Sequence, residues 1–486
     1  MKKNYNIIKM FKNKRYFKFI IGIILTLLVV IIIFISFHKS PTIFFLGDNG
    51  STLYYVIPGR DPVMLLDNCL TVDIKSNSTQ SISYYCVDRT DGKKSLYYVH
   101  SNKKPVLIAD SILKYDVGRG NYKKVFYTTK NNTSTTDFYM VMNGSKQYTI
   151  IKYSSVYDFS ISTDGKYVSY LDQQADLFIS SGKDAGQKIS GSVSIIKNTP
   201  YSKQCYFITK DKILYYSNLG KTPTKILDKV DSIQGITSNG KSCVFGTTES
   251  DIYTFTNAKS VNLVDKSCSL PIKFINQDQN AVPTSVKFTY IKGENAYFNV
   301  NGTTKSKLGN MVTDLCYDKK DGGFYFIEGN NEVYFAKLSF NHVKDKLKIT
   351  DGATDLITND KDNVAGFISS TNLISLSKGK IGKQLASDVS ANMFVRANGN
   401  YIYLYTNFSS PSSLYSLSML NLKNNKVTQV DTDVSLPKIK NLNIAYGKMD
   451  YLAYFKNYKD GKGSLYIFTG GGKSKKLADN VMTLFS

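Results

Sequence analysis

The chain has few of the residues on which enzymes and metalloproteins depend. Its 486 residues include three histidines, six cysteines and no tryptophan. No His-x-x-x-His or Cys-x-x-Cys spacing occurs, which argues against a dedicated zinc site. A Gly-x-Ser-x-Gly elbow is also absent, which argues against a serine hydrolase of that class. We therefore expect a protein that is not an enzyme and that holds no metal or cofactor.

Long helical patterns are missing as well. Beyond residue 40, no extended run of apolar residues follows the 3.6-residue period of an amphipathic helix. Tyrosine, in contrast, is abundant with 36 copies, and 42% of all residues are hydrophobic. Aromatic and β-branched residues suit pleated, half-buried surfaces, so the composition predicts an all-β fold.

One apolar stretch stands apart at the N-terminus. Residues 19–37 contain no charge, and their length is close to the roughly 20 residues that a membrane-spanning helix needs. Residues 1–18 carry seven cations and no acid, which predicts a cytoplasmic N-terminus. The competing interpretation is a cleaved signal peptide, whose apolar core is usually only about 7–15 residues long. We expect an uncleaved single-pass anchor in the cell membrane, with residues 42–486 outside.

The charge balance is strongly basic. The formal net charge is +24, and beyond residue 18 there remain 55 basic and 38 acidic residues, or +17. Such a surface attracts anionic lipids and anionic envelope polymers. The alternative is that the lysines are simply scattered over the surface, since they form no dense block. We expect no nucleic-acid partner, because no nucleic-acid motif is present.

A degenerate repeat covers the exterior part. Short apolar runs that end in aspartate recur about 36–47 residues apart, a spacing typical of propeller blades with four strands each. Examples of these anchors are Leu65-Leu66-Asp67, Leu107-Ile108-Ala109-Asp110, Ile226-Leu227-Asp228, Leu263-Val264-Asp265 and Lys476-Leu477-Ala478-Asp479. Asp-Gly or Asn-Gly pairs fall between the expected first and second strands at 164–165, 239–240, 321–322 and 398–399. These pairs supply the positive φ that tight hairpins need.

One unit carries a family resemblance. Residues 162–170, STDGKYVSY, resemble the Ser-Pro-Asp-Gly-Lys-x-Ile-x-Phe signature of TolB-like, WD-repeat-like β-propellers, with Thr163 in place of the usual proline. The stretches 91–97 and 460–466 resemble the entry to that family's third strand. The resemblance implies a propeller that serves mainly in protein binding or as an accessory domain. It supplies no ligand residues.

The two ends of the exterior part complement each other. Residues 42–66 match the second, third and fourth strands of a unit, whereas residues 480–486 match a first strand. We expect these segments to pair and to close the array. With ten complete units, the composite unit makes about eleven, above the usual 4–8 blades. Either two rings, which the count favours, or one unusually wide ring would accommodate them.

The cysteines offer one candidate bridge. Cys69 falls in a first strand and Cys86 in the next strand of the same unit, so folding this hairpin would bring them opposite each other. The exterior compartment permits oxidation. We predict a possible Cys69–Cys86 disulfide. The other four cysteines are expected to be buried thiols.

Two kinds of function remain open. The first is a membrane-tethered, extracytoplasmic binding or scaffold module for proteins or cell-envelope polymers. The alternative is a polysaccharide-active lyase or hydrolase with carboxylates at the centre of the propeller. A transmembrane sensor would need a partner in the membrane, because residues 1–18 leave no room for a signalling domain.

Overall fold

The computed structural model is all-β in the part of the chain that it describes. That part is 43–485 without 48–49, 58, 77–81, 91–92, 101–102, 118–122, 131–134, 153–154, 163, 199–203, 219–220, 238, 276–285, 359–363, 398–400, 410–413, 436–443, 447–450 and 470–473. Within it lie 43 strands and no helix, hence none that could span a membrane. The predicted cytoplasmic segment 1–18 and membrane segment 19–37 lie outside the described residues.

Eight four-stranded antiparallel sheets, which we call blades 1 to 8, follow one another in the chain. The first four are β4 Cys69–Ser76, β5 Ile82–Thr90, β6 Lys93–His100, β7 Val106–Ala109; β8 Ile112–Val117, β9 Lys124–Lys130, β10 Thr136–Met142, β11 Lys146–Ile151; β12 Asp158–Ile161, β13 Val168–Leu171, β14 Leu177–Ser180, β15 Gln187–Ser190; and β16 Val193–Asn198, β17 Gln204–Thr209, β18 Leu214–Asn218, β19 Thr224–Leu227.

The next four have the same order of strands. They are β20 Val230–Ile236, β21 Cys243–Thr247, β22 Ile252–Thr256, β23 Ser260–Asp265; β24 Ser269–Phe274, β25 Lys287–Lys292, β26 Asn295–Val300, β27 Thr304–Asn310; β28 Asp314–Asp318, β29 Gly323–Glu328, β30 Glu332–Ser339, β31 His342–Thr350; and β32 Ala353–Thr358, β33 Val364–Ser369, β34 Asn372–Ser377, β35 Lys380–Ala386.

The remaining strands form one continuous eleven-stranded sheet. It contains blade 9 (β36 Val389–Ala397, β37 Tyr401–Ser409, β38 Leu414–Asn421, β39 Lys426–Ser435), blade 10 (β40 Ile444–Tyr446, β41 Tyr451–Lys459, β42 Lys462–Thr469, β43 Lys475–Phe485) and β1 Ile43–Gly47, β2 Thr52–Val56, β3 Val63–Leu66. The sheet is continuous because β39 and β43 each run from the outer position of one blade into the next.

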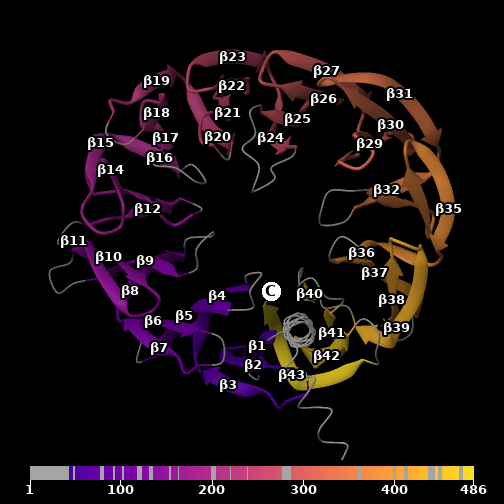
Figure 1. Ribbon diagram of the computed structural model, residues 1–486, viewed down its shortest axis with the longest axis horizontal. Coiled ribbons are helices and arrows are strands. Elements are labelled where there is room, and N and C mark those ends of the chain that lie inside the picture. Colours follow the sequence, from indigo (N-terminus) through magenta and orange to yellow (C-terminus); the bar gives the residue numbers. More distant parts are fainter. Residues whose placement is uncertain are drawn as a thin grey trace, which may run out of the picture.

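Strand β43 joins the two ends of the described chain. Its first half pairs with β42, and its second half pairs with β1, where Phe44 is the backbone partner of Phe485 and Phe45 that of Leu484. Strands β43, β1, β2 and β3 thus make a composite blade 11 from both ends of the described chain. Figure 1 shows the sheets following one another around a circle.

The core lies between neighbouring blades. The second strand of a blade is packed on both sides, and Tyr206, Phe207 and Ile208 of β17 are fully buried. One apolar cluster combines residues of β17 and β18 with Val230 and Phe245 of the next blade. This double-sided packing explains why the second strands are nearly continuous runs of apolar and aromatic residues. The outer fourth strands pack on fewer neighbours and are largely exposed.

The aspartate anchors mark the passage from one blade to the next. Asp67, Asp110 and Asp479 are each followed by a residue with a φ of 56°. These residues are Asn68, Ser111 and Asn480, respectively. The residue after each of these is buried; Cys69 and Ile112 begin the first strands β4 and β8, and Val481 lies within β43 where that strand passes into blade 11. The left-handed residue turns the chain from the outer edge of one blade to the inner strand of the next. The anchors are therefore structural elements of the repeat.

Candidate binding faces

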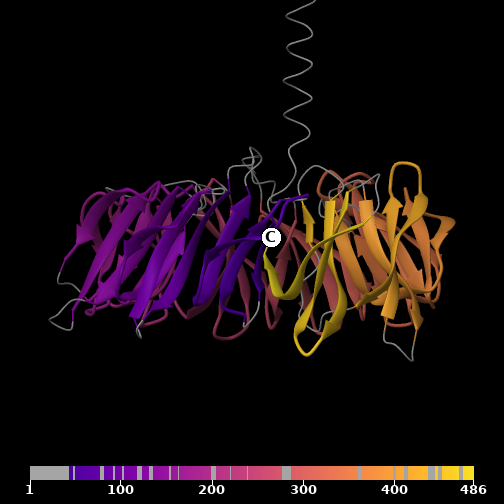
Figure 2. The same ribbon diagram turned by 90° about the horizontal axis from the view of Figure 1, so that it is seen from below.

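The strand order gives the disc two different faces. Figure 2 shows the strands running between these faces. Antiparallel order places the turns between first and second strands and between third and fourth strands on one face, which we call the turn face. Turns between second and third strands and the connectors between blades lie on the opposite face, the connector face. Strand β1 is the second strand of blade 11, so the chain enters the propeller at the turn face.

The turn face is basic. Among the described residues between strand ends on this face, there are thirteen exposed cations and four acids. The cations are Arg60, Lys103, Lys104, Lys123, Lys166, Lys183, Lys221, Lys241, Lys259, Lys319, Lys320, Lys378 and Lys423. The acids are Asp61, Asp164, Asp184 and Asp321. Such an excess attracts anions to this face.

The connector face has the opposite sign. Over the described residues between strand ends on this face there are five exposed cations and twelve acids, of which nine are exposed, Asp172 and Asp176 are half-buried and Asp251 is buried. The acids are Asp67, Asp110, Asp172, Asp176, Asp211, Asp228, Glu249, Asp251, Glu294, Asp351, Asp388 and Asp460. The cations are Lys152, Lys210, Lys212, Lys229 and Lys266. The propeller thus separates charge between its two faces.

Several connector-face carboxylates stabilise the fold. The Thr52 hydroxyl donates a hydrogen bond of 2.6 Å to Asp67, and the Ser95 hydroxyl one of 2.5 Å to Asp110. The hydrogen bonds from the Thr52 hydroxyl and the Asn68 N–H hold the pKa of Asp67 below its usual value. The acidic character of this face therefore follows in part from the anchor motif itself.

The turn-face cations are exposed side chains in hairpin turns. Of the thirteen cations, Lys166 takes part in a salt bridge that the structure describes, with Asp164 at 3.4 Å. Lysine side chains are flexible, strongly hydrated point charges that attract anions without fixing their geometry. Sequence reasoning treated these residues as scattered because they are far apart in the chain. Their common signal is position within the unit, since each falls either between the first and second strands or between the third and fourth strands.

Charged groups on the first strands mainly join neighbouring blades. Lys114 Nζ of β8 lies 2.5 Å from Asp158 Oδ1 of β12, and Lys197 Nζ of β16 donates to the Ile233 carbonyl of β20 at 2.9 Å. The Leu356 N–H of β32 donates to Asp314 of β28 at 2.9 Å. Asp158 and Asp314 on the inner strands thus have partners in the neighbouring blade.

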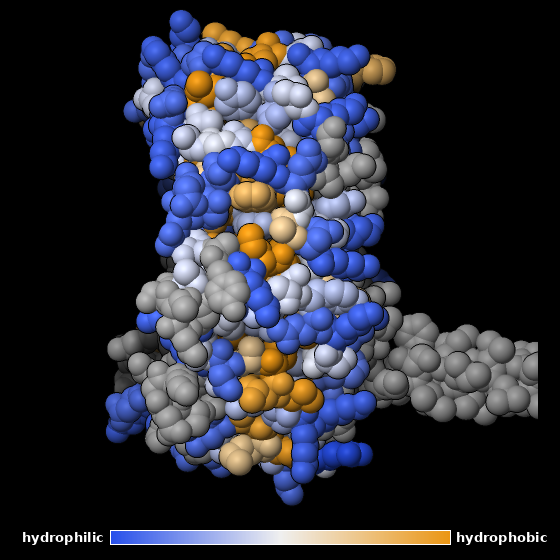
Figure 3. Space-filling view, turned by 90° about the vertical axis from the view of Figure 1, so that its left-hand side faces the viewer, coloured by the Kyte–Doolittle hydropathy of each residue, from blue (hydrophilic) through white to orange (hydrophobic). Residues whose placement is uncertain are grey.

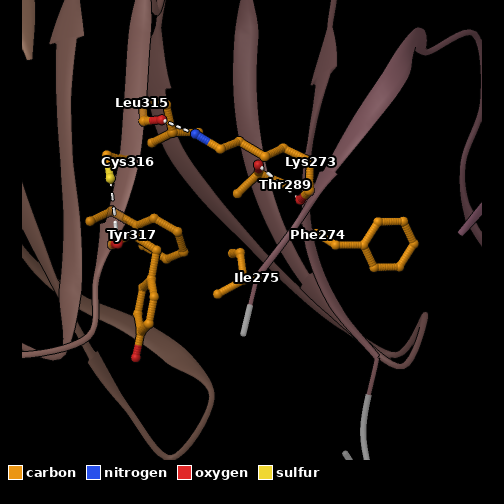
Figure 4. A pocket seen from close by; sticks show the side chains of 8 residues that line it. Lys273, Phe274, Ile275, Thr289, Leu315, Cys316 and Tyr317 are labelled. Carbon is orange, nitrogen blue, oxygen red and sulfur yellow. Dashed lines mark hydrogen bonds between the residues drawn. The ribbon is translucent and has the colours of Figure 1, made fainter. Parts of the chain in front are cut away.

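A small hollow lies between blades 6 and 7 (Figure 4). Its lining is mostly apolar, with Phe274 and Ile275 on one side and Leu315 and Phe324 on the other. Lys273 Nζ spans the gap and donates to the Leu315 carbonyl at 2.9 Å. This repeats the inter-blade bond that Lys197 makes. The hollow could accept a small apolar group, but its one cation already serves to join the two blades.

The outer edge of the disc combines apolar and polar side chains. Figure 3 views this edge on the side of β11 and β15, where apolar residues form a broken line between hydrophilic borders. On the edge strands β3 and β7, Val63, Met64, Val106 and Leu107 are 45–61% exposed.

The hairpin register bears on the predicted disulfide. Cys86 is the backbone partner of Val72, and Cys69 that of Asp88, so the two cysteines are not directly opposite each other. The expectation that the two cysteines face each other directly was wrong, because the register of the hairpin as a whole places Val72, and not Cys69, opposite Cys86. Cys69 takes the buried position that starts a first strand, where other blades have Val or Ile. The side chain of Cys86 lies outside the described side chains, and the bridge itself stays a prediction.

The other cysteines fit a structural role. Cys205 and Cys243 are fully buried in second strands, and burial raises the pKa of the Cys205 thiol to about 12. Such a thiol is a poor nucleophile, because the thiolate is the reactive form. Over the part of the chain that the structure describes, no group of three or more His, Cys, Asp or Glu side chains could hold a metal ion.

Comparisons with known proteins show structural likeness only. No family model matches the chain, and neither does any curated protein. A crystal structure of a eukaryotic initiation factor is 10% identical, over 92% of this chain and 98% of that one, with a TM-score of 0.43. The tricorn protease is 9% identical over 91% of this chain and 57% of its own, with a TM-score of 0.27. The BP39L lectin from Burkholderia pseudomallei is 9% identical over 54% and 93%, with a TM-score of 0.30.

These TM-scores are below 0.5, so no argument on function rests on them. The class of protein follows from the chain's own sheets. Repeated four-stranded antiparallel blades in sequence order around a circle define a β-propeller.

Proposed function

We propose that this chain is a membrane-tethered, extracytoplasmic β-propeller of a single closed ring that binds partners without catalysis. The observation that carries the proposal is the separation of charge, with a basic turn face and an acidic connector face. Charge complementarity steers partners and selects among them. The basic N-terminus and the apolar stretch 19–37 support the tether. The connector face, opposite the point of chain entry, is the face free to receive a partner.

A protein partner with a basic surface suits the connector face best. An anionic envelope polymer would be repelled there and would instead approach the turn-face lysines. The polysaccharide-cleaving alternative has less support, since Asp158 and Asp314 on the inner strands are engaged between blades. It would require a pair of carboxylates free to act on a sugar.

Site-directed photocrosslinking in intact cells tests this proposal. A photoreactive amino acid at Phe408 or Tyr157, which are 53% and 54% exposed on the connector-face side, should yield a discrete crosslinked protein. The matched probe at Phe340, on the turn face, should not yield the same product. Reproducible cleavage of a polysaccharide by the purified protein, abolished by one substitution on a first strand, would overturn the non-enzymatic part. Absence of any product from the connector-face probes would overturn the binding face.

A further inference from the structure

We propose that the turn face lies against an anionic lipid surface and that the Phe340 side chain enters it. This inference rests on the proposed tether and adds a second, non-covalent contact between the propeller and the membrane. Three observations carry it: the place of chain entry, the exposed aromatic residue at a hairpin tip, and the lysines around it.

The place of entry limits how far the turn face can move from the bilayer. Strand β1 starts with Ile43 at this face, and the predicted membrane segment ends at Phe37. The five residues 38–42 span at most about 17 Å when fully extended, at roughly 3.4 Å per residue. A tether of this length keeps the turn face toward the membrane at blade 11. The acidic connector face is then held away from anionic lipids.

The hairpin between β30 and β31 carries the apolar contact. Ser339 pairs with His342, so Phe340 and Asn341 form a two-residue turn on the turn face. Phe340 is 95% exposed and has a φ of 48°. A bulky residue is uncommon in the left-handed region, and two-residue turns favour Asn or Gly there. The fold thus gains neither packing nor an easy backbone conformation from this phenylalanine, whereas a membrane interface would bury it.

Cations surround the hairpin tip. Lys337 and Lys344 flank it on the two strands, and both are exposed. Lys319 and Lys320 occupy the other turn of blade 7 on the same face. An apolar residue that enters the acyl boundary, with lysines at the level of the headgroups, is the usual composition of an interfacial membrane contact. Each lysine near an anionic leaflet adds electrostatic attraction that falls off within a Debye length.

A soluble polyanion is the competing occupant of this face. It would explain the lysines but not the nearly complete exposure of the apolar Phe340 side chain on the face where the chain enters the propeller. The short linker also brings the lipid surface to the face without any diffusing partner. The observations therefore favour the lipid.

The absence of tryptophan allows a direct test in the full-length chain. Phe340→Trp introduces a single tryptophan at the hairpin tip, and Phe408→Trp introduces one at an exposed aromatic position on the opposite face. Each variant is reconstituted into vesicles of phosphatidylglycerol or of phosphatidylcholine, with and without brominated acyl chains. Thermal unfolding in detergent verifies that both variants fold.

The expected result is quenching of the Phe340→Trp emission by at least twofold in brominated phosphatidylglycerol, with a shift to shorter wavelength. Phosphatidylcholine should quench it less, and Phe408→Trp should be unaffected in either lipid. Adding Lys337→Gln and Lys344→Gln to the Phe340→Trp variant should reduce the quenching by at least half. Equal, weak quenching of both tryptophans overturns the proposal. So does a spectral response of Phe340→Trp to soluble dextran sulfate but to neither lipid.

The tether and the docking fail in different ways. If residues 19–37 do not anchor the chain, alkaline carbonate will extract the protein from the vesicles. If the anchor holds but Phe340 stays in water, the protein remains with the vesicles and the tryptophan stays unquenched. Neither result bears on the connector-face crosslinks, which test the binding function separately.

Discussion

Phe44 and Phe485 are backbone partners in adjacent strands, β1 and β43, although almost the whole described chain separates them. This pairing places the last residues of the chain in the interior of a sheet. Chain ends usually fray and tolerate deletion. Here the end of the chain supplies the inner strand of blade 11, and Val481 is fully buried.

Deletion of residues 481–486 should therefore destabilise the protein strongly. It removes the buried Val481 and exposes the edge of β1. Burial of each large apolar side chain contributes about 1.5–3 kcal/mol, so a loss of several kcal/mol is expected, together with aggregation through the open edge. Thermal unfolding measures the effect. Replacing the same six residues by a Gly-Ser sequence is the length-matched control, and an unchanged melting temperature in either variant would contradict the pairing.

Asp265 should lend pH-dependent stability to the junction of blades 5 and 6. Although burial tends to raise its pKa, hydrogen bonds from Lys292 and Lys305 outweigh this and lower the pKa of Asp265 to about 2. Lys292 Nζ lies 2.6 Å away, and the Tyr290 hydroxyl donates at 3.1 Å. Because the folded-state pKa is below the unfolded value near 3.9, the contribution is present above pH 4 and is lost as the pH falls toward 2.

Asp265→Asn should consequently lower the free energy of unfolding by about 1–2 kcal/mol at pH 7. This figure allows for the partial exposure of the two lysines, which weakens their attraction to the carboxylate. In denaturant titrations, the difference in unfolding free energy between this variant and the natural protein should become smaller as the pH falls from 4 to 2. Asp228→Asn removes an exposed pair with Lys225 at 2.8 Å and should leave the stability nearly unchanged, because solvent screens exposed ion pairs. A cost for Asp265→Asn that persists at pH 2 would show that packing, and not charge, is responsible.

Ser111 tests the blade connectors. Its φ of 56° suits glycine, and its carbonyl accepts a hydrogen bond from the Lys130 N–H at 3.1 Å. We expect Ser111→Gly to leave stability unchanged or to raise it by up to about 1 kcal/mol, and Ser111→Val to lower it by about 1–2 kcal/mol. Thr149→Val, at an exposed position in the strand β11, is the control and should have little effect. Similar stabilities for the Gly and Val variants at position 111 would rule out the backbone explanation.

The membrane topology makes a prediction in intact cells. Protease added from outside, after removal of any wall, should digest the chain beyond residue 40 and leave the lysine-rich segment 1–18 protected. This follows from the excess of cations on the N-terminal side of the apolar stretch. Immunoblots against tags at the two ends measure the outcome. An N-terminal tag that is accessible from outside would contradict the orientation, and a mature protein that starts near Ser40 would indicate cleavage.

The sequence determined much of the fold because its signals are local and repeated. The aspartate anchors identified the blade connectors, and Gly165, Gly240 and Gly322 have the positive φ that their Asp-Gly and Asn-Gly turns predicted. Apolar second strands likewise follow from burial on both faces. Repetition strengthened each weak signal, since the same pattern recurred at one phase of the unit.

Register and the distribution of charge depended on tertiary structure. Cys69 lies opposite Asp88 because of a bulge between Cys69 and Thr71, which the residue pattern does not indicate. Lysines such as Lys103, Lys241 and Lys378 are far apart in the chain, and they share a face only because antiparallel strands return every second turn to the same side. The exposure of Phe340 could not be predicted from the sequence either, since a phenylalanine in a β-rich chain is ordinarily a core residue. Local patterns fix where strands begin and end, whereas long-range packing decides which side chains meet.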